Sequence, residues 1–430
     1  MKVLVIGGGG REHALVWALR KSARVSEVVC APGNGGIAAL ARCIAVDMND
    51  VDAMMRLAKA EQPGLVVVGP ELPLSLGLVN KLEKGGMRVF GPIQEAARLE
   101  TSKAFAKEFM RTHEIPTAAY AVCCSIEEVR EELGTFAGSV VVKADGLAAG
   151  KGVVICDTLL QAEAAAVEMF SGTLLGEPVK TVVLEQFLVG EELSFFALCD
   201  GKHAVALAVA QDHKRVGEGD TGPNTGGMGA YSTDALMDHA MRAWLTKNIA
   251  QKVVDGMASE RTPFRGILFC GLMMVPLADG TTQPMVLEFN TRFGDPETQA
   301  VMMRLDSDLV ELMEAAIDGK ANRLQIRMKS GASVCVIAAS GGYPGKYEAG
   351  KTIHGLDTKL ADGVEVFHSG TAAKDGGYVT AGGRVLGITA VSPVGLQDAL
   401  AKAYGAMEKI SFEGMQYRKD IGWRALRTDQ

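Results

Sequence analysis

The sequence predicts an α/β protein in which an N-terminal doubly wound parallel-sheet domain is followed by α+β domains. Over residues 1–101, short apolar runs alternate with helical stretches, as in a parallel sheet that helices cover on both faces. Beyond residue 329, strands with glycine-rich turns follow one another, which is typical of a small α+β domain. A chain of 430 residues exceeds what one hydrophobic core usually covers. We therefore expect two to four domains and place the boundaries at 1–101, 102–328 and 329–430.

The composition indicates a cytoplasmic globular enzyme. Hydrophobic residues make up 48% of the chain and charged residues 22%, and the net charge of −7 argues against a nucleic-acid-binding protein, which would be basic. The eight cysteines form no Cys-x-x-Cys pair, which indicates free thiols in a reducing compartment. The chain opens on a strand-like run rather than a signal peptide, and no apolar run approaches the roughly 20 residues of a membrane helix. We expect neither a nucleic-acid partner nor a membrane partner.

The first βα unit predicts an anion site. Residues 2–6 are apolar, glycines occupy positions 7–10, and residues 11–20 have helical spacing. Unpaired N–H groups and the helix dipole would point at such a turn. The third glycine of a dinucleotide fingerprint would fall at Glu12, so the pattern does not favour a dehydrogenase. Further strands at 27–30, 65–68 and 88–90 complete the sheet, and the loops at their C-terminal ends should face a ligand.

The chain is organised around residues 140–154, where a glycine-rich turn joins two β-type runs. Lys143 ends the first run, and Lys151 lies between Gly150 and Gly152. Because glycines let backbone N–H groups approach an anion, the hairpin suits nucleotide phosphates, although its spacing is not that of a P-loop. The alternative is an ordinary hairpin with a mobile tip. Helices are expected before it at 95–113 and 126–133, and after it at 160–169.

Downstream of the hairpin, strand 181–185 precedes a turn at 186–190 and a strand at 193–199. Residues 211–231 are polar, glycine-dense and far too long for a simple turn, which predicts a functional loop. A helix at 238–257, strands at 266–275 and 283–289, and a helix at 308–317 should follow. The last section predicts strands at 332–338, 364–368, 378–380 and 383–389, and a helix at 396–410.

A strand near residue 288 carries a candidate metal site. Glu288 and Asn290 are two residues apart and point to the same face of the strand, and Arg292 follows at the same period. Magnesium prefers a few protein oxygens together with substrate oxygens and water, so this pair suits Mg²⁺ held mainly by nucleotide phosphates. The alternative is a solvent-facing polar stripe on an edge strand.

Taken together, these blocks are more specific than any one of them. The glycine hairpin with its lysines, Glu185 before an apolar turn and the Glu288-x-Asn290-x-Arg292 strand resemble the ATP-grasp enzymes. Residues 9–13, 211–229, 293–299 and 418–424 closely resemble the phosphoribosylamine–glycine ligase (glycinamide ribonucleotide synthetase) family of purine biosynthesis. The resemblance spans the whole chain.

The chain departs from that pattern at two places. Gly8 stands where bacterial members of the family often have asparagine, which leaves a side-chain role at this turn open. Many ATP-grasp relatives have an acidic metal ligand on the preceding strand, where this chain has Leu272, Met273 and Met274. The resemblance therefore implies a metal site that rests on one carboxylate and one amide.

The resemblance implies a carbon–nitrogen ligase that forms ADP. Glycine would be joined to 5-phosphoribosylamine through a glycyl phosphate, giving glycinamide ribonucleotide, ADP and phosphate. The N-terminal domain would be a Rossmann-like substrate domain, and residues 102–328 an ATP-grasp domain with residues 121–193 as the subdomain that carries the flap. The partners would be the small-molecule substrates alone, with Mg²⁺ or Mn²⁺, in a monomeric protein.

The resemblance also implies roles for individual residues. Glu288 and Asn290 would hold the metal. The residues implied in ATP binding are Lys103, Lys143, Gly146, Gly150, Lys151, Gly152, Glu185, Gln186, Phe187, Leu188 and Glu192. Those implied in catalysis are Arg292, Lys143, Asp212, Lys214 and Asp295, of which Asp212, Lys214 and Asp295, with the turn at 7–10, would serve glycine and phosphoribosylamine.

Alternatives stand beside these roles. Lys103 could be a solvated lysine, Glu192 an exposed glutamate in a turn, and His213 a general base or a structural residue. A sister ATP-grasp ligase, such as a carboxylating enzyme, is disfavoured by the blocks at 222–229 and 293–299. A nucleotide-binding module without turnover is disfavoured because Glu288 and Lys143 are both present.

Overall fold

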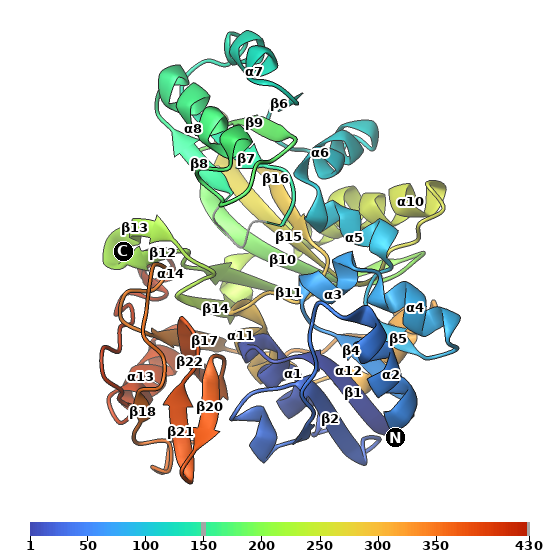
Figure 1. Cartoon of the computed structure of the whole chain (residues 1–430), viewed down its shortest axis with the longest axis vertical. Coiled ribbons are helices and arrows are strands. Elements are labelled where there is room, and N and C mark those ends of the chain that lie inside the picture. The colour runs from blue at the N-terminus through green and yellow to red at the C-terminus, as the bar shows by residue number, and fades with distance from the viewer. Residues whose placement is uncertain (148–151, 428–430) are drawn as a thin grey trace.

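The computed structural model describes residues 1–147 and 152–427 of the chain. In Figure 1 the N-terminal domain (blue) lies at the lower right, the hairpin-bearing subdomain at the top, and the C-terminal strands (orange to red) at the lower left. Within the described residues, no helix combines the length and the apolar character that crossing a membrane would need.

The N-terminal domain contains a five-stranded parallel sheet in the order β3-β2-β1-β4-β5. Its strands are β1 (Lys2–Gly7), β2 (Glu27–Pro32), β3 (Arg42–Cys43), β4 (Leu65–Val68) and β5 (Val89–Phe90). Successive residues of β1 enter two different cores, because side chains alternate across a strand. Val3 and Val5 belong to one core and Leu4 and Ile6 to the other. The predicted doubly wound parallel sheet is confirmed.

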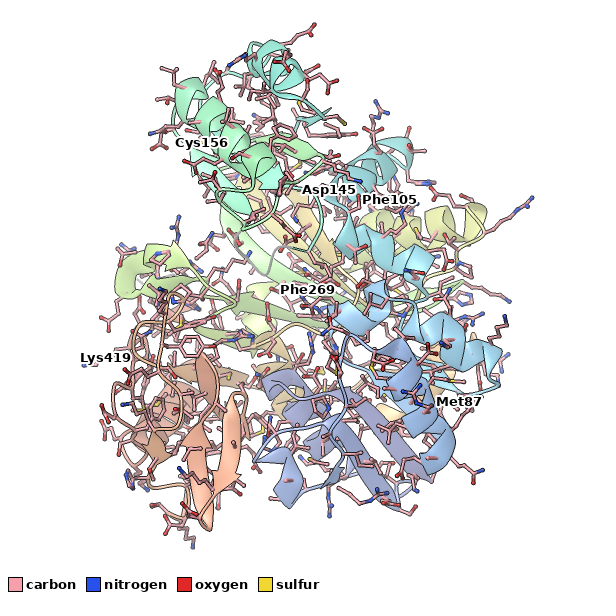
Figure 2. All side chains as sticks on the ribbon, in the orientation of Figure 1. Met87, Phe105, Asp145, Cys156, Phe269 and Lys419 are labelled. Carbon is pink, nitrogen blue, oxygen red and sulfur yellow. The ribbon has the colours of Figure 1, made fainter. Side chains whose placement is uncertain are left out.

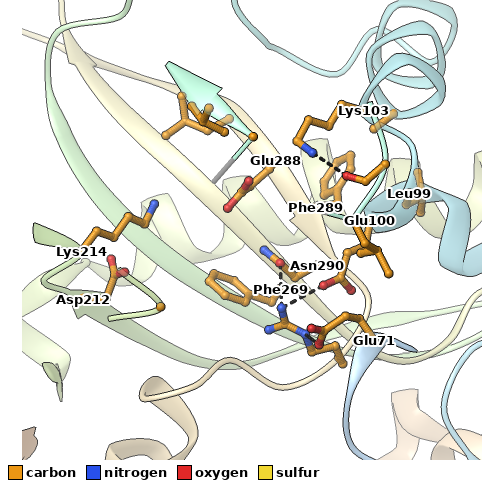
Figure 3. Close-up of a pocket in the computed structure, with 18 of the residues that line it drawn as sticks. Glu71, Leu99, Glu100, Lys103, Asp212, Lys214, Phe269, Glu288, Phe289 and Asn290 are labelled. Atoms are coloured by element: carbon orange, nitrogen blue, oxygen red, sulfur yellow. Dashed lines mark hydrogen bonds and ion pairs between the residues drawn. The ribbon is translucent and has the colours of Figure 1, made fainter. Parts of the chain in front are cut away.

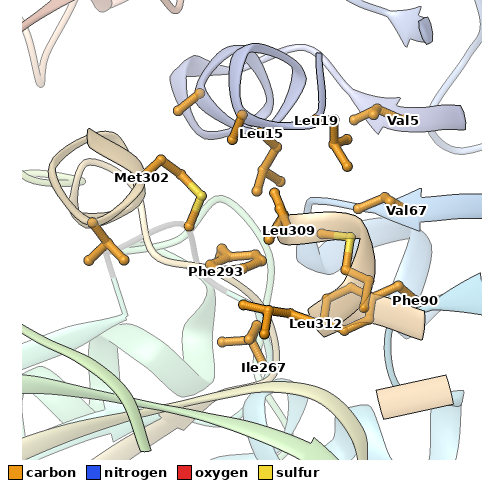
Figure 4. Packing of buried hydrophobic residues seen from close by; sticks show 14 of the residues in the cluster. Val5, Leu15, Leu19, Val67, Phe90, Ile267, Phe293, Met302, Leu309 and Leu312 are labelled. Atoms are coloured by element: carbon orange, nitrogen blue, oxygen red, sulfur yellow. The ribbon is translucent and has the colours of Figure 1, made fainter. Parts of the chain in front are cut away.

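Helices cover both faces of this sheet. Helices α2 (Val51–Glu61) and α4 (Leu78–Lys84) pack on one face, and α1 (Gly10–Leu19) packs on the other. The second face is also covered by α12 (Leu309–Ile317), a helix from much later in the chain. Figure 4 shows Leu309 of α12 below Leu15 of α1, and Leu312 beside Ile267. The N-terminal domain is therefore fused to the domain that follows it through a shared hydrophobic core.

Two helices lead from this domain to the hairpin-bearing subdomain. The predicted helix at 95–113 is two helices, α5 (Gln94–Thr101) and α6 (Lys103–Thr112). They separate at Ser102, whose backbone is extended and whose hydroxyl accepts a hydrogen bond from the N–H of Phe105. Ser102 thereby caps α6 and ends α5, because a capping residue cannot itself be helical.

The subdomain that follows is a four-stranded antiparallel sheet in the order β6-β9-β7-β8, packed against two helices. Its elements are β6 (Tyr120–Cys123), α7 (Ile126–Leu133), β7 (Val140–Ala144), β8 (Val153–Cys156), α8 (Leu159–Ser171) and β9 (Val182–Gln186). Strands β7 and β8 pair from Val140↔Cys156 to Lys143↔Val153, which confirms the predicted hairpin. The base of the hairpin is fixed to α6, since Asp145 accepts hydrogen bonds from the N–H of Ala104 and the hydroxyl of Ser102. Figure 2 shows Asp145 beside Phe105 of α6.

The largest sheet has eight strands in the order β16-β15-β10-β11-β14-β17-β22-β19. They are β10 (Glu191–Asp200), β11 (Ala204–Asp212), β14 (Gly229–Thr233), β15 (Arg265–Pro276), β16 (Thr282–Asn290), β17 (Ala332–Ala339), β19 (Val364–His368) and β22 (Arg384–Ser392). Residues 211–231, predicted as a loop, hold the hairpin of β12 (Arg215–Gly217) and β13 (Thr221–Asn224) and the central strand β14. Because β14 pairs with both β11 and β17, the sheet continues across residue 329, where the sequence predicts a separate domain.

The C-terminal part nevertheless has a core of its own. Helix α13 (Leu396–Met407) packs on β17 and β22, and its apolar residues join theirs in one cluster. A small sheet, β18 (Thr352–Ile353), β21 (Gly377–Thr380) and β20 (Thr371–Lys374), and the short helix α14 (Trp423–Arg427) complete it.

The remaining α-helices are α3 (Glu71–Ser75), α9 (His239–Leu245), α10 (Gln251–Ser259) and α11 (Glu297–Arg304). A π-helical turn at Thr246–Ala250 interrupts the single helix predicted at 238–257.

Candidate active site

A cavity of about 240 Å³ lies where the hairpin, α6, the end of β16 and the loops after β11 and β16 meet. It brings together predicted site residues from across the sequence: Lys103, Gly146, Gly152, Glu185, Asp212, Lys214, Glu288, Asn290, Arg292 and Asp295. Lys143, Gln186, Phe187, Leu188 and Glu192 lie outside its lining. The predicted Gly150 and Lys151 lie outside the described residues.

Glu185, on β9, is the centre of a buried cluster with two lysines. The Nζ of Lys143 lies 2.8 Å from Oε1 of Glu185, and the Nζ of Lys107 lies 2.7 Å from Oε2. The three side chains are at most 8% exposed. Lys143 also donates to the carbonyl oxygen of Leu287 at 3.2 Å. A buried charge is tolerated when it is paired, and here each carboxylate oxygen faces one cation.

Lys103 links α6 to the hairpin. It is the first residue of α6, and its Nζ donates to the carbonyl oxygen of Gly146 at 2.9 Å. Burial lowers the pKa of Lys103 from its ordinary value, although the carboxylate of Glu288 opposes the shift. The alternative of a solvated lysine is therefore not supported, because the Lys103 side chain lines the cavity and binds the hairpin at Gly146.

Glu288 and Asn290 project into the cavity from the end of β16, as Figure 3 shows. In that view the Glu288 carboxylate lies between Lys103 on one side and Lys214 on the other. Burial alone would raise the pKa of Glu288, but nearby cations, Lys214 and Lys143 first among them, outweigh it and the pKa is lowered. Strand β16 is an edge strand, yet these side chains do not form a solvent-facing stripe.

The oxygen ligands in this cavity suit a divalent cation that is also coordinated by phosphate oxygens. Within residues 1–147 and 152–427, no group of three or more His, Cys, Asp or Glu side chains is placed to hold a metal. Glu288 supplies an ionised carboxylate and Asn290 an amide oxygen on the same face of one strand. This small number of protein oxygens suits Mg²⁺, which is commonly completed by substrate phosphates and water.

Arg292 is fixed by two carboxylates that the sequence did not single out. Its Nη2 lies 2.9 Å from Oε1 of Glu100, and its Nε lies 3.2 Å from Oε2 of Glu71 (Figure 3). Nη2 also donates to Oδ1 of Asn290 at 3.3 Å. Burial would lower the pKa of Arg292, but the two carboxylates raise it. The guanidinium therefore stays charged and oriented beside the candidate metal ligands.

The opposite side of the cavity is acidic. Lys214 forms an ion pair with Glu192 at 2.5 Å, so Glu192 is a paired residue on β10 rather than an exposed glutamate in a turn. Burial raises the pKa of Asp212. Burial and the charge of Asp212 raise the pKa of Glu297 to about 7, and Ser194 donates a hydrogen bond to its Oε1. The buried Glu297 and the half-buried Asp212 on one wall favour a cationic ligand group there.

Loops from three regions meet at Asp295. Its Oδ1 accepts a hydrogen bond from Gln299 at 2.8 Å, and its Oδ2 lies 3.4 Å from Nη2 of Arg384. Arg384, on β22, also donates through Nη1 to the carbonyl oxygens of Gly226 at 2.5 Å and of Asp295 at 2.7 Å. The C-terminal part thus fixes both the glycine-dense loop 222–229 and the loop after β16.

The glycine turn before α1 is closed by its own side chains. Glu12 accepts a hydrogen bond from the N–H of Gly9 at 2.7 Å and forms an ion pair with Arg11. Glu12 therefore fills the place of the third glycine in a dinucleotide fingerprint, which argues against a dehydrogenase. A Cβ added at Gly8 would lie 2.5 Å from the carbonyl oxygen of Gly33. At this position a side chain would therefore require the backbone of the facing loop to move.

The histidines near the site are neutral and structural. His213 is fully buried, and its Nε2 accepts a hydrogen bond from the N–H of Gly422. Burial and the charge of Arg424 lower the pKa of His213 to about 3, so it is neutral at physiological pH. His213 is absent from the cavity lining among the described residues, which favours the structural role over that of a general base.

Sequence reasoning missed five residues of this region: Glu71, Glu100, Lys107, Glu297 and Arg384. Two of them carried a signal: Lys107 lies four residues after Lys103 and so on the same face of a helix, and Glu297 lies within the block 293–299. Glu71 follows a glycine–proline pair, and Arg384 begins a strand far along the chain, and neither position implies a contact with the site.

The chain matches three family models in succession. Residues 1–100 match the phosphoribosylglycinamide synthetase N domain, residues 101–298 its ATP-grasp (A) domain, and residues 333–424 its C domain. A phosphoribosylamine–glycine ligase of Xanthomonas axonopodis pv. citri is 48% identical over 433 residues, which cover 100% of this chain and 99% of the relative. The Salmonella typhimurium ligase of that name is 46% identical over 434 residues, covering 100% of both chains.

Solved structures give the same picture. The crystal structure of the phosphoribosylamine–glycine ligase of Thermotoga maritima has a TM-score of 0.85 and 35% identity, and the match covers 98% of this chain and 100% of that one. The biotin carboxylase domain of a Hydrogenobacter thermophilus 2-oxoglutarate carboxylase, solved with MgADP, has a TM-score of 0.75 at 17% identity. That match covers 97% of this chain and 91% of the other, and it shows a shared fold alone.

Proposed function

Because the chain belongs to the phosphoribosylamine–glycine ligase (phosphoribosylglycinamide synthetase) family, we propose that the cavity described above joins glycine to 5-phosphoribosylamine with ATP. The protein is an ATP-grasp carbon–nitrogen ligase that forms ADP. It carries out the step of purine biosynthesis that makes glycinamide ribonucleotide. The carboxylate of glycine takes the γ-phosphoryl group, and the amine of phosphoribosylamine then attacks the glycyl phosphate and releases phosphate.

One observation carries the assignment of roles. Glu288 and Asn290 lie beneath the hairpin, with lysines on both sides and Arg292 beside them. Phosphoryl transfer needs positioned cations around a charged group more than it needs covalent help from the protein. The arrangement supports a triphosphate that lies between the hairpin and the end of β16.

The phosphate-binding part consists of Lys103, Lys143 and the hairpin turn. Lys103 already contacts the hairpin at Gly146, so closure of the turn and placement of its ammonium group are linked. The turn residues proposed to cover the phosphates are Gly146, Gly150, Lys151 and Gly152. Covering them excludes water from the acyl phosphate, which would otherwise hydrolyse.

Glu288 and Asn290 would hold Mg²⁺ or Mn²⁺. When bound, the cation supplies positive charge that neutralises the phosphate oxygens during transfer. Glu100 and Glu71 hold Arg292 against Asn290. The guanidinium is therefore already in position to stabilise the transferred phosphoryl group or the glycine carboxylate and need not reorient during the reaction.

We propose that the adenine lies beside Glu185, at the end of β9. Glu185 accepts from the exocyclic amino group, and the backbone of Gln186, Phe187 and Leu188 reads the edge of the base. Glu192 accepts from the ribose hydroxyl groups while Lys214 holds it in place. Gln186 and Phe187 are exposed, which leaves that edge open to an incoming base.

The acidic wall suits the other substrates. The ammonium group of glycine is a cation of the size that Asp212 and Glu297 can accept together. Asp295 lies where the α1 turn, loop 222–229 and β22 meet, so we assign it, with Lys214, to the position of phosphoribosylamine.

We further propose that the protein acts as a monomer in the cytoplasm.

A coupled assay tests the proposal. Freshly generated phosphoribosylamine, glycine, ATP and Mg²⁺ should give ADP together with incorporation of labelled glycine into an amide product. Omitting glycine should reduce ADP release to background, because no carboxylate is present to take the phosphoryl group. Omitting the amine should do the same, because the glycyl phosphate is sequestered from water. Equal ADP release without the amine would refute the sequestered intermediate, and ADP release with no amide product would refute the ligase.

A further inference from the structure

Lys107 is a buried cation that the mechanism above does not use. Its side chain is 2% exposed, on α6, one helical turn beyond Lys103. Its Nζ lies 2.7 Å from Oε2 of Glu185 and donates to the hydroxyl of Thr117 at 2.7 Å. Thr117 in turn donates to the carbonyl oxygen of Val286 at 2.6 Å. The ammonium group is therefore held between α6, β9 and the segment beside β16, and it cannot swing toward a phosphate without breaking these contacts.

The two oxygens of Glu185 are not equivalent. Oε2 is held by Lys107. Oε1 lies 2.8 Å from the Nζ of Lys143, but among the described residues it is a buried oxygen without a hydrogen-bond donor. Glu185 and Lys107 both line the cavity. Oε1 is thus an acceptor with an unused lone pair at the wall where we place the adenine.

We propose that Lys107 is a positioning residue that fixes Glu185 as an acceptor and thereby selects 6-amino over 6-oxo purine nucleotides. The inference rests on the proposed function, since it assumes that Glu185 reads the base. A carboxylate between two ammonium groups can only accept hydrogen bonds. Adenine presents an amino donor at position 6, whereas hypoxanthine and guanine present a carbonyl acceptor, and two facing acceptors repel each other.

Burial supports this role. Burial lowers the pKa of Lys107 to about 8 although Glu185 opposes the shift, so the lysine is still largely protonated at neutral pH. A buried lysine in this position adds no phosphate contact. What it adds is a second fixed partner for Glu185, which prevents the carboxylate from turning its free oxygen away from the cavity.

The test compares ATP with inosine triphosphate, which replaces the 6-amino group by a carbonyl without adding a 2-amino group. Phosphate release gives kcat/KM for both nucleotides. In Lys107→Met, which keeps the side-chain length and removes the charge, the ATP-to-ITP ratio of kcat/KM should fall about tenfold or more, as expected for loss of one charge-assisted hydrogen bond. Lys107→Arg keeps the charge and should restore part of the ratio.

Two further variants complete the design. Arg111→Met removes a charge one turn later on α6, at a residue that pairs with Glu108 outside the cavity, and should leave the ratio unchanged. Thr117→Val removes the second anchor of Lys107 and should lower the ratio more modestly. It serves as the test if thermal melts show that Lys107→Met does not fold.

The outcomes separate the two hypotheses. If Lys107→Met lowers kcat/KM for both nucleotides equally, with the ratio of the wild type, Lys107 is only structural and the inference is overturned. If the wild type does not discriminate, or if Glu185→Gln leaves the ratio unchanged, the assignment of Glu185 to adenine in the proposed function fails first. If Glu185→Gln and Lys107→Met both lower the ratio, the positioning role is supported.

Discussion

Replacement of Arg384 by methionine should impair the substrate loops while sparing ATP binding. Arg384 donates to the carbonyl oxygens of Gly226 at 2.5 Å and Asp295 at 2.7 Å, and it lies 3.4 Å from the carboxylate of Asp295. Its side chain is 20% exposed, so water can replace only part of these contacts. A hydrogen bond to a charged group contributes about 1.5–3 kcal/mol, and a buried carbonyl left without a donor adds its own cost.

Loss of two such bonds, discounted for partial exposure, should destabilise the ordered loops by about 3 kcal/mol. This corresponds to a roughly 10²-fold decrease in the population of the ordered loops. We therefore expect kcat/KM for glycine and for phosphoribosylamine to fall by about 10²-fold. The dissociation constant of ATP should change by less than about threefold, because Arg384 is outside the cavity lining. Arg384→Lys should rescue little, since a single ammonium group cannot reproduce the fork of the guanidinium.

Steady-state kinetics with each substrate varied, calorimetry with ATP, and hydrogen exchange of residues 222–229 measure these effects. Lys402→Met is the matched control, because Lys402 pairs with Asp398 on α13, in the same part of the protein. Normal kcat/KM for glycine and phosphoribosylamine would refute the role of Arg384. A kinetic loss without faster exchange in 222–229 would refute the reasoning through loop order.

Four more predictions follow from the site and its walls. Glu288→Gln should lower kcat by about 10²-fold or more and weaken ATP binding without abolishing it, and near-normal kcat at saturating Mg²⁺ would remove the metal assignment. Removal of divalent cations by a chelator should stop ADP release, and restoration by Mn²⁺ as well as Mg²⁺ would show that the site accepts both. Gly8→Ala should lower the melting temperature, because its Cβ would lie 2.5 Å from the carbonyl oxygen of Gly33, whereas Gly405→Ala, in an open helical position, should not. His13 has its pKa lowered to about 3 by burial and by the neighbouring histidine, so it is neutral in the folded state; its stabilisation is full above pH 6.5 and is lost as the pH falls toward 3. His13→Gln should therefore reduce the slope of unfolding free energy between pH 6 and 4 by about 1 kcal/mol per pH unit, and parallel curves for the two proteins would contradict this.

Local sequence patterns predicted those parts of the fold in which the contacting residues lie close together in the chain. The hairpin β7–β8 could be recognised because its two apolar runs and glycine turn lie within a few residues of one another. Glu288 and Asn290 could be placed on one face because the period of a strand is two. In both cases the covalent chain itself fixes the relation between the residues.

Strand β14 shows why the large sheet could not be predicted in the same way. It lies within a polar, glycine-dense segment, and nothing in its own sequence signals a central strand. Gly229 is a strand residue because it pairs with Val336, and a Cβ there would lie 2.7 Å from the carbonyl oxygen of Cys335. Gly229 allows close packing against a strand that is far away in the sequence. The need for a glycine at this position therefore cannot be inferred from the neighbouring residues alone.

The charge balance of the cavity is likewise a property of the fold. Three cations that the sequence singled out have carboxylate partners from other regions: Lys143 with Glu185, Lys214 with Glu192, and Arg292 with Glu71 and Glu100. Over the described lining, four cationic side chains stand against seven carboxylates. A cavity with this excess of acid would repel a bare triphosphate, because like charges in a poorly solvated site interact strongly. The lysines alone, which a sequence reading emphasises, would suggest a site that attracts phosphate by itself. With their partners in place, the cavity favours a triphosphate only when a divalent cation enters with it.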